Sequence, residues 1–307
     1  MYLLLWIFFV YAFLGWCTEV SFAALTSGRF VNRGFLNGPV CPIYGVGVVI
    51  VLFFLDPLRG NTFLLFLGSV LLTSLLEWVT GFVLEKIFHQ RWWDYSNEPF
   101  NLGGYICLRF SIAWGLACLF VVEIIHPSIL WLIHLIPHTL GLVLLALFSA
   151  GMLVDLAATV RTIARMNRQL TQLDELAGRI KALSNELGEN LVERVIDAAE
   201  LGSGLREDIQ ENLEDAKDVL AQRREDLQDS LEDMKESLAE RRMQYQMDQA
   251  ERLEQRQRDL AELRTKLEAA MARPIFGQRR LMRAFPKMRS TTHAQALERL
   301  RQWMEKR

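Results

Sequence analysis

The N-terminal half of the chain contains apolar stretches long enough to cross a lipid bilayer, and this feature limits the fold more than any other. A membrane helix needs about 20 mostly apolar residues, because the bilayer core offers no partner for exposed backbone N–H and C=O groups. Prolines and glycines at the start of the second stretch make it the shortest. The predicted spans are residues 3–25, 40–55, 63–84, 104–122 and 129–154.

The C-terminal half has a different composition. Charges are scarce up to about Asp155, whereas nearly every helical turn from Arg161 onward carries a charged residue. No proline lies between Pro137 and Pro274, as a long helical region requires. Apolar residues, mostly leucine, recur at heptad-like spacing within residues 173–187, 220–238 and 253–267, which is typical of a coiled coil. The first part of this charged region is interrupted by Gly178, Gly188, Gly202 and Gly204.

These patterns predict an all-α fold: a polytopic membrane helix bundle of about five spans, followed by a cytoplasmic helical or coiled-coil region. The register shifts favour two or more helices, either folded back as an antiparallel hairpin or paired between subunits, over one unbroken rod. The predicted domains are residues 1–158 in the membrane, 159–272 as the charged helical region, and 273–307 as a basic amphipathic tail. The tail could lie on the anionic inner leaflet or dock onto the loops, and a short helix is expected over residues 292–305.

The distribution of Lys and Arg predicts the orientation of the chain. Cytoplasmic loops of membrane proteins carry an excess of these residues. They occur after the last span and in the first and third connections, so these segments are expected in the cytoplasm and the N-terminus outside. The chain start has no basic region or cleavage site typical of a signal peptide. We therefore expect a multi-pass protein of the cell (inner) membrane in contact with the lipid bilayer.

Several functional classes are disfavoured by charge and motif content. The net charge of -2, with acids and bases mixed, argues against nucleic-acid binding. No phosphate-binding loop and no common hydrolase or kinase motif is present, so an enzyme is not favoured and no cofactor is expected. His134 and His138 could share a ligand, but no further residue completes a metal site, and polar packing is favoured. The cysteines are read as reduced, packed thiols.

Three charged residues are predicted to lie inside the membrane at a similar depth. Glu19 is late in the first span, Glu77 is late in the third, and Arg109 is early in the fourth. Charges within spans are costly and usually face a cavity or a partner. Ion pairing among these three is expected. They could form a substrate or lipid site, or an internal clasp that sets the helix register.

The two connections next to this cluster are rich in glycine, proline and aromatic residues. Residues 32–45 and 91–104 could line a pocket that faces the cytoplasm. For the adjacent Trp92 and Trp93, anchoring at the membrane interface is favoured over stacking on a ligand. The further residues expected around the pocket are Arg29, Arg33, Asp94, Glu98 and Asn101.

Four segments together resemble one bacterial family of small membrane proteins, described as putative ABC transporter permease, type IV. The resemblance covers most of the membrane domain and the tail, and it implies transport and an ATP-binding subunit as partner. The cytoplasmic coupling loop of ordinary importer permeases is not seen, so the first or third connection would have to couple. The segments are Gly34-Phe35-Leu36-Asn37-Gly38-Pro39 with Cys41-Pro42-Ile43-Tyr44-Gly45, Glu77-Trp78 with Thr80-Gly81, Trp92-Trp93-Asp94-Tyr95-Ser96 with Pro99-Phe100-Asn101, and Arg279-Arg280-Leu281-Met282-Arg283-Ala284-Phe285-Pro286.

Three functional hypotheses follow. The favoured one is a permease-like transporter subunit, expected as a homo-oligomer, with Glu19, Glu77 and Arg109 near the substrate path. The second is a membrane scaffold or adaptor whose charged helices recruit another cytoplasmic protein. The third is a lipid-binding or lipid-modifying enzyme at the inner leaflet, in which Asp94, Glu98 and Arg109 would act.

Overall fold

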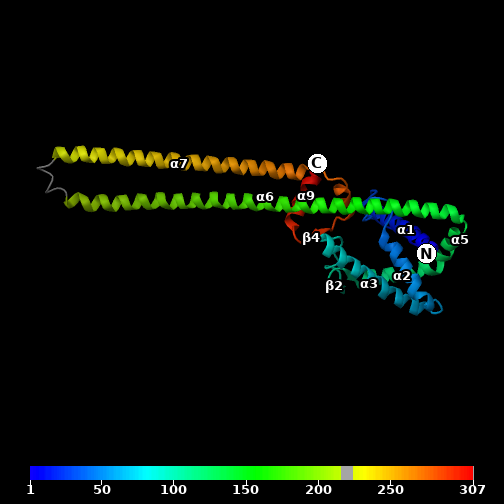
Figure 1. Cartoon of the computed structure of the whole chain (residues 1–307). Helices are drawn as coiled ribbons and strands as arrows, with labels where there is room; N and C mark the ends of the chain where they lie inside the picture. Colours follow the sequence, from blue (N-terminus) through cyan, green and yellow to red (C-terminus); the bar gives the residue numbers. More distant parts are fainter. Residues whose placement is uncertain (216–223, 307) are drawn as a thin grey trace. The chain divides into compact units, whose positions relative to one another are not determined.

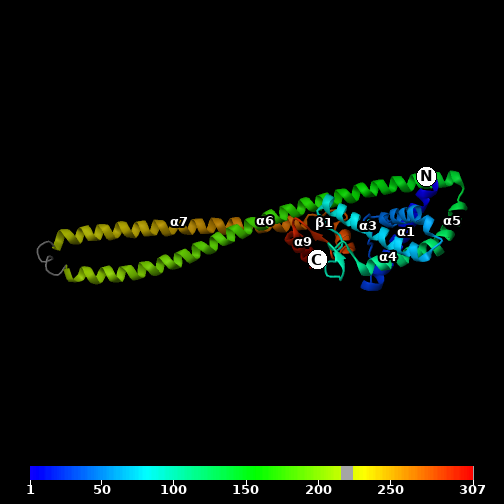
Figure 2. The ribbon, with the colours of Figure 1, turned by 90° about the horizontal axis from the view of Figure 1, so that it is seen from below.

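The computed structural model describes the backbone of residues 1–215 and 224–306, and the side chains of these residues except 188–215, 224–235, 238 and 242. The chain divides into two compact units. Unit 1 comprises Met1–Thr171 and Arg273–Arg307, and unit 2 comprises Gln172–Ala272. Figures 1 and 2 show that helices dominate both units. The predicted all-α class is therefore confirmed.

Unit 1 begins with three helices whose ends are set by local sequence. Helix α1 (Tyr2–Ser27) ends at Gly28, which adopts the left-handed conformation that glycine tolerates. Helix α2 (Pro42–Leu55) continues into the short 3-10 turn η1 (Asp56–Leu58). Helix α3 (Thr62–Phe88) starts after Asn61, whose side chain accepts two backbone N–H groups of the first turn.

The second half of the bundle corrects the predicted boundaries of the last two spans. Helix α4 (Leu108–Phe120), the π-helical turn η2 (Val121–Ile125) and helix α5 (His126–His134) form one apolar helix from Leu108 to His134. The predicted break at 123–128 is therefore wrong. Pro127 is tolerated because it lies in the first turn of α5, directly after the wider π turn.

The chain instead reverses at residues 135–137. The N–H groups of Leu135 and Ile136 bond three residues back, which tightens the end of α5, and Pro137 then stops the helix. Helix α6 (His138–Asp215) begins directly after it. His134 and His138, expected on one helix, thus lie on two different helices.

Four described helices are long and apolar enough to cross a membrane, and together they make this a membrane protein. They are Tyr2–Ser27, Thr62–Phe88, Leu108–His134 and His138–Leu187. The apolar segment Pro42–Leu58 is shorter than the roughly 20 residues that a bilayer requires. A total of five spans therefore stays a prediction.

Close approaches at glycines join the helices of unit 1. A Cβ atom on Gly45 of α2 would overlap the backbone carbonyl of Phe8 on α1, and one on Gly15 would overlap the ring of Tyr44. Small residues at such crossings let helices pack closely where no water drives their association. Apolar clusters complete the packing, one of them around Trp6, Phe9 and Leu145.

Two loops and the C-terminal segment lie together at one end of unit 1, and we call this region the polar end. Loop 1 is residues 28–41, loop 3 is residues 89–107, and the C-terminal segment is residues 273–306. Loop 3 holds strands β1 (Gln90–Arg91), β2 (Asn101–Leu102) and β3 (Ile106–Cys107), with β2 antiparallel to β3. The C-terminal segment holds α8 (Gln278–Ala284), β4 (Arg289–Ser290) and α9 (Ala294–Glu305). Strand β4 pairs antiparallel with β1, so the segment is docked onto loop 3.

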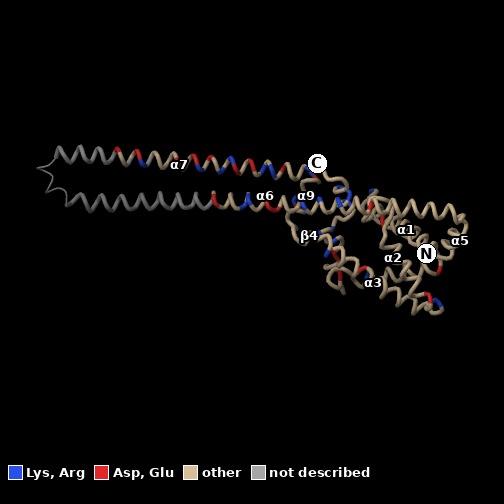
Figure 3. Tube along the Cα trace, viewed as in Figure 1, with Lys and Arg blue, Asp and Glu red and all other residues tan. Residues whose placement is uncertain are grey.

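Unit 2 is formed by the remainder of α6 and by α7 (Arg224–Ala272). The two helices lie side by side and antiparallel, joined by an ion pair of 2.7 Å between Arg256 Nη2 and Glu186 Oε1 (Figures 1 and 2). Figure 3 shows acids and bases interspersed along the described part of α7. We call this unit the helix pair.

The helix pair agrees with the expectation of more than one helix, but the glycines do not interrupt it. Helix α6 runs through Gly178, Gly188, Gly202 and Gly204 without a break, because single glycines weaken a helix by only about 1 kcal/mol. The side chains of leucine block 220–238 lie outside the described residues. Coiled-coil packing therefore remains a prediction.

Candidate polar site at one end of the membrane bundle

Glu19 is held by residues of α2 and loop 1. Its Oε1 accepts a hydrogen bond of 2.7 Å from the Tyr44 hydroxyl, and its Oε2 lies 3.5 Å from Arg33 Nε. The Arg33 guanidinium also lies over the ring of Phe22, with its carbon 5.5 Å from the ring centroid. The cation that meets Glu19 is thus Arg33 and not the predicted Arg109.

Glu77 occupies a different environment in α3. Its Oε1 accepts a hydrogen bond of 3.3 Å from the Tyr95 hydroxyl of loop 3. Its Oε2 is buried and has no hydrogen-bond partner among the described residues. Burial raises the pKa of Tyr95, and the Glu77 carboxylate adds to this effect, so the hydroxyl stays protonated and donates. Glu77 is therefore an incompletely satisfied acid within a membrane helix.

The two remaining cations of the predicted set are exposed. Arg109 makes no ion pair with any described residue, and its guanidinium carbon lies 5.8 Å from the ring centroid of the neighbouring Phe110. Arg29 is likewise exposed at the end of α1. The expected ion pairing of Arg109 with Glu19 and Glu77 is not present in this structure.

Asp94 joins loop 3 to the C-terminal segment. Its Oδ2 lies 3.1 Å from Arg289 Nη1, and its Oδ1 lies 3.7 Å from Arg91 Nη1. The backbone N–H of Ser96 donates to Oδ1 at 3.0 Å, and the Ser96 hydroxyl also donates to this oxygen. Burial opposes ionisation of Asp94, but the Ser96 hydrogen bonds and the charges of Arg289 and Arg91 lower its pKa overall.

Glu98 and Asn101 form a turn within loop 3. The Asn101 amide donates to the backbone carbonyls of Ser96 and Glu98, and its oxygen accepts the N–H of Gly104. No ion pair of Glu98 is present among the described residues. The role of Asn101 is thus to close this turn.

Loop 1 is organised by Asp155 of α6, a residue that the sequence reasoning did not select. The Asp155 carboxylate accepts the backbone N–H groups of Asn37 and Gly38, at 3.1 and 2.7 Å, and the Asn37 side-chain amide at 2.8 Å. Asn32 closes the other side of the loop through Gly34 N and Asn37 O. One feature of the sequence could have indicated this role: Asp155 is the last acid in the apolar part of the chain.

The carbonyl groups of the same loop are bound by Arg280 of α8. Its Nη1 donates to the carbonyls of Gly34 and Leu36 at 2.6 and 2.9 Å, and its Nη2 donates to that of Phe35 at 3.0 Å. Arg280 belongs to the tail motif 279–286 noted in the sequence, but its partners could not be read there. Asp155 and Arg280 together satisfy both kinds of backbone group in loop 1.

The C-terminal segment also contacts α6 and loop 3. Gln278 donates to Gln169 at 2.7 Å, and Thr162 donates to the carbonyl of Phe276 at 3.0 Å. The N–H of Thr291 bonds to the carbonyl of His89 at 3.1 Å. Of the two alternatives for the tail, docking onto the loops is the one observed.

Trp92 lies inside an aromatic cluster and not at an exposed surface. It is 3% exposed, and its ring centroid is 5.0 Å from that of Phe285 in the C-terminal segment. Phe35 of loop 1 and Phe88 of α3 complete the cluster, at 5.1 and 6.4 Å from Trp92. The prediction that Trp92 anchors the membrane interface is therefore wrong, because the docked segment covers it.

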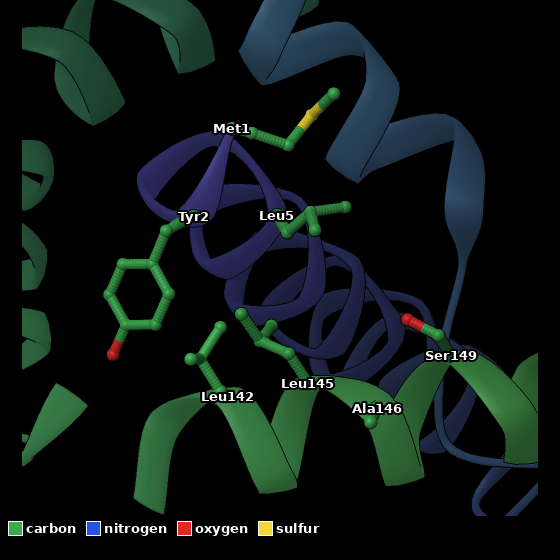
Figure 4. Close-up of a pocket in the computed structure, with 7 residues that line it drawn as sticks. All are labelled: Met1, Tyr2, Leu5, Leu142, Leu145, Ala146 and Ser149. Atoms are coloured by element: carbon green, nitrogen blue, oxygen red, sulfur yellow. The ribbon is translucent and has the colours of Figure 1, made fainter. Parts of the chain in front are cut away.

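Two pockets among the described residues lie away from this site. One of about 430 Å³ is formed by the start of α1 and by α6, at the other end of unit 1 (Figure 4). Its walls are mainly apolar and include Tyr2, Leu5, Leu142 and Leu145. A second, of about 460 Å³, lies within the helix pair between Arg179 and Lys266. The predicted pocket at the polar end thus remains a hypothesis.

The membrane helices and the two loops between them can be compared with known proteins. No solved structure matches this chain. A family model matches residues 6–160, which is half of the chain and covers most of α1, all of α2 to α5, and loops 1 and 3. The chain belongs to the family described as "Putative ABC-transporter type IV".

Proposed function

We propose that this chain is a permease-like membrane subunit of a transporter, with its substrate path near Glu19 and Glu77. The observation that carries the proposal is the buried Oε2 of Glu77, which has no hydrogen-bond partner among the described residues. An acid within a membrane helix is costly and usually serves a cavity, a partner or an ion pathway. Membership of a transporter-type family supports the same conclusion.

The neighbouring groups are suited to a polar path between helices. Tyr44 connects α2 to Glu19 of α1, and Tyr95 connects loop 3 to Glu77 of α3. Four elements thus place hydroxyl and carboxylate groups within the polar end. A substrate, cation or proton that reached Glu77 Oε2 would supply the partner that this oxygen lacks.

The proposed orientation places the polar end in the cytoplasm and the N-terminus outside. Arg29, Arg33, Arg91 and the cations of the C-terminal segment all belong to the polar end. An excess of Lys and Arg near the membrane favours the cytoplasmic side.

An ATP-binding subunit is the proposed partner, and the polar end is the proposed coupling surface. Loops 1 and 3 are joined there by the C-terminal segment through Arg280 and Arg289. A partner that bound this surface would act on both loops together. A homo-oligomer of this chain is part of the same proposal.

The first test is affinity purification of the intact protein from native membranes, followed by mass spectrometry. The proposal predicts a stoichiometric ATP-binding subunit. If another cytoplasmic protein is retained instead, and no ATP-binding subunit appears, the permease proposal is wrong.

The second test measures water access to Glu77. We expect Glu77→Cys to react with a membrane-impermeant thiol reagent, because a substrate path must be open to water. Ser69→Cys is a matched control, since Ser69 lies two turns away on α3 and is 0% exposed. Equal protection of both positions would contradict a path at Glu77. In complexes that contain the ATP-binding subunit, Glu77→Gln should abolish transport while the subunits still assemble.

A scaffold function is the second candidate, and the helix pair favours it. Helices α6 and α7 present many exposed charged residues over unit 2, as a recruiting surface would. Deletion of 172–272 should then remove the retained partner, whereas Glu77→Gln should not. The permease proposal also predicts that Glu77→Gln keeps the partner, but it predicts that this change abolishes transport.

The enzyme hypothesis receives less support from the site. Asp94 is engaged by Arg289, Arg91 and Ser96, so its carboxylate serves to dock the C-terminal segment. Arg109 contacts Phe110 and meets neither Asp94 nor Glu98 among the described residues. These residues therefore do not form one catalytic group.

A further inference from the structure

The conformation of loop 1 depends on a segment that is remote in sequence. Arg280 provides the hydrogen-bond donors for the carbonyls of Gly34, Phe35 and Leu36, which are 244 to 246 residues away. A buried carbonyl without a donor is costly, because it has given up its hydrogen bonds to water. Loop 1 thus lacks internal donors for three consecutive carbonyl groups.

The same segment is fastened to loop 3 by independent contacts. Strand β4 pairs with β1, Arg289 pairs with Asp94, and the Phe285 ring covers Trp92. The segment therefore bridges two loops that lie at the ends of different membrane helices. Loss of these contacts would uncover the Phe35, Phe88 and Trp92 cluster.

The chain order connects this bridge to the helix pair. Unit 2 is an insertion in unit 1, which the chain leaves after Thr171 and enters again at Arg273. Arg280 follows seven residues later, in the first half of the short α8, and residues 273–277 join α8 to the end of α7. A pull on the end of α7 would act first on the contacts of Phe276 with Thr162 and of Gln278 with Gln169, and then on those of Arg280.

The hydrogen bonds of Arg280 to loop 1 can be exchanged for hydrogen bonds to water. Arg280 meets neutral carbonyls, and its Nε has no hydrogen-bond partner among the described residues. Burial also lowers the pKa of Arg280, although the nearby Asp155 carboxylate opposes this effect. A buried guanidinium with an unused donor is held less firmly than one in a bidentate pair with a carboxylate.

We propose that the C-terminal segment is a reversible clamp on loops 1 and 3 of the polar end. In the clamped state, Arg280 holds loop 1 and β4 holds loop 3. In the released state, both loops lose these partners together. This inference concerns regulation and does not depend on what the protein transports.

Cys41 provides a native reporter of the clamp. It is 5% exposed and lies at the end of loop 1, whose carbonyls Arg280 binds. Cys118 lies in α4, away from the clamp, and serves as an internal reference for the bundle. Reaction of each thiol with N-ethylmaleimide is followed by mass spectrometry of its peptide, using the full chain in native membranes.

The clamp predicts that Arg280→Gln accelerates labelling of Cys41 by about 10- to 100-fold and leaves Cys118 unchanged. Arg279→Gln is the matched control, because Arg279 is the exposed neighbour with the same charge. An unchanged Cys41 rate in Arg280→Gln would overturn the proposal. Equal acceleration of Cys118 would also overturn it, since Arg280 would then support the whole bundle.

A disulfide tests whether release of the segment is the cause. Gln90 and Ser290 face each other across β1 and β4, at a spacing that engineered cysteines can bridge. Arg289→Gln removes the ion pair with Asp94 on loop 3 and leaves Arg280 in place, so release of the segment should also accelerate labelling of Cys41 in this variant. Adding Gln90→Cys and Ser290→Cys to Arg289→Gln should return the Cys41 rate to that of the native chain when oxidised, and not when reduced. A native Cys41 rate in Arg289→Gln, or a rate that stays high in the oxidised form, would contradict a clamp.

Discussion

The polar end of unit 1 and the helix pair of unit 2 both contain many charged residues, but they use these residues in opposite ways. At the polar end, partners are remote in sequence: Asn37 bonds to Asp155, 118 residues away. In the helix pair, several ion pairs join residues four apart, such as Arg258 with Glu254 and Arg252 with Asp248. These local pairs are exposed on both sides. A charge therefore specifies tertiary structure only where burial and a remote partner make its loss costly.

Asp155→Ala, which removes the acceptor that holds loop 1, is expected to have the largest effect on stability. The change would leave two half-buried backbone N–H groups and the Asn37 amide without their acceptor. Hydrogen bonds to a charged group contribute about 1.5–3 kcal/mol each, so we expect the free energy of unfolding to fall by at least about 3 kcal/mol. Denaturation by SDS in detergent micelles measures this loss. If the loss is no larger than that caused by removing an exposed charge of the helix pair, the distinction between the two regions is wrong.

Glycine substitutions provide a second contrast. Gly45→Ala would force a Cβ atom into the carbonyl oxygen of Phe8, and backbone atoms on two packed helices cannot move apart freely. We expect a loss of about 1–3 kcal/mol in unfolding free energy. Gly178→Ala in the helix pair is the control, because no atom lies within 4 Å of the added Cβ. It should gain up to about 1 kcal/mol from helix propensity, and equal effects at both sites would contradict the packing described.

Acid should weaken the docking of the C-terminal segment before it affects the helix pair. The folded pKa of Asp94 is below its ordinary value of 3.8, so its contribution is full above that value. It is lost as the pH falls through the depressed folded pKa. Hydrogen exchange of β4, corrected for intrinsic rates, should accelerate below about pH 4. Asp94→Asn should accelerate the same amides at neutral pH and remove this acid dependence; a persisting dependence would assign it to another group.

The smallest effect is expected for the local ion pairs of the helix pair. Arg258→Gln removes the pair with Glu254, both of whose side chains are mostly exposed. The free energy of unfolding should change by about 0.5 kcal/mol or less, and the change should shrink further in high salt. Hydrogen exchange in α7 provides the measurement. A large loss would mean that Arg258 has a tertiary role which the structure does not show.

The prediction of helices from apolar runs succeeded, but the break between the last two spans was misplaced. Two prolines, Pro127 and Pro137, were available to end a helix, and a linear pattern does not rank them. The π turn before Pro127 accommodates the first, whereas the tight turn at Leu135 and Ile136 ends the helix at the second. The difference depends on backbone hydrogen bonds that composition does not report.

The candidate site was predicted by residue type and depth, and its partners were not. Glu19, Glu77 and loop 3 do lie at one end of the bundle with the residues that hold them. Yet Arg33, and not Arg109, meets Glu19, and Asp155 and Arg280 were missed. Spacing along one helix predicts a face, but it does not predict which residue of a distant segment reaches that face.

The sequence by itself determined the all-helical membrane class and the division between apolar and charged halves. These properties are sums over neighbouring residues, so a local pattern is enough to predict them. The docking of the C-terminal segment onto loops 1 and 3 and the burial of Trp92 became visible only in the folded structure. The same is true of loop 1, where Asp155 accepts backbone N–H groups and Arg280 donates to backbone carbonyls. Such pairings require groups far apart in sequence to come within about 3 Å in a suitable direction, and that condition is met only when the whole unit folds.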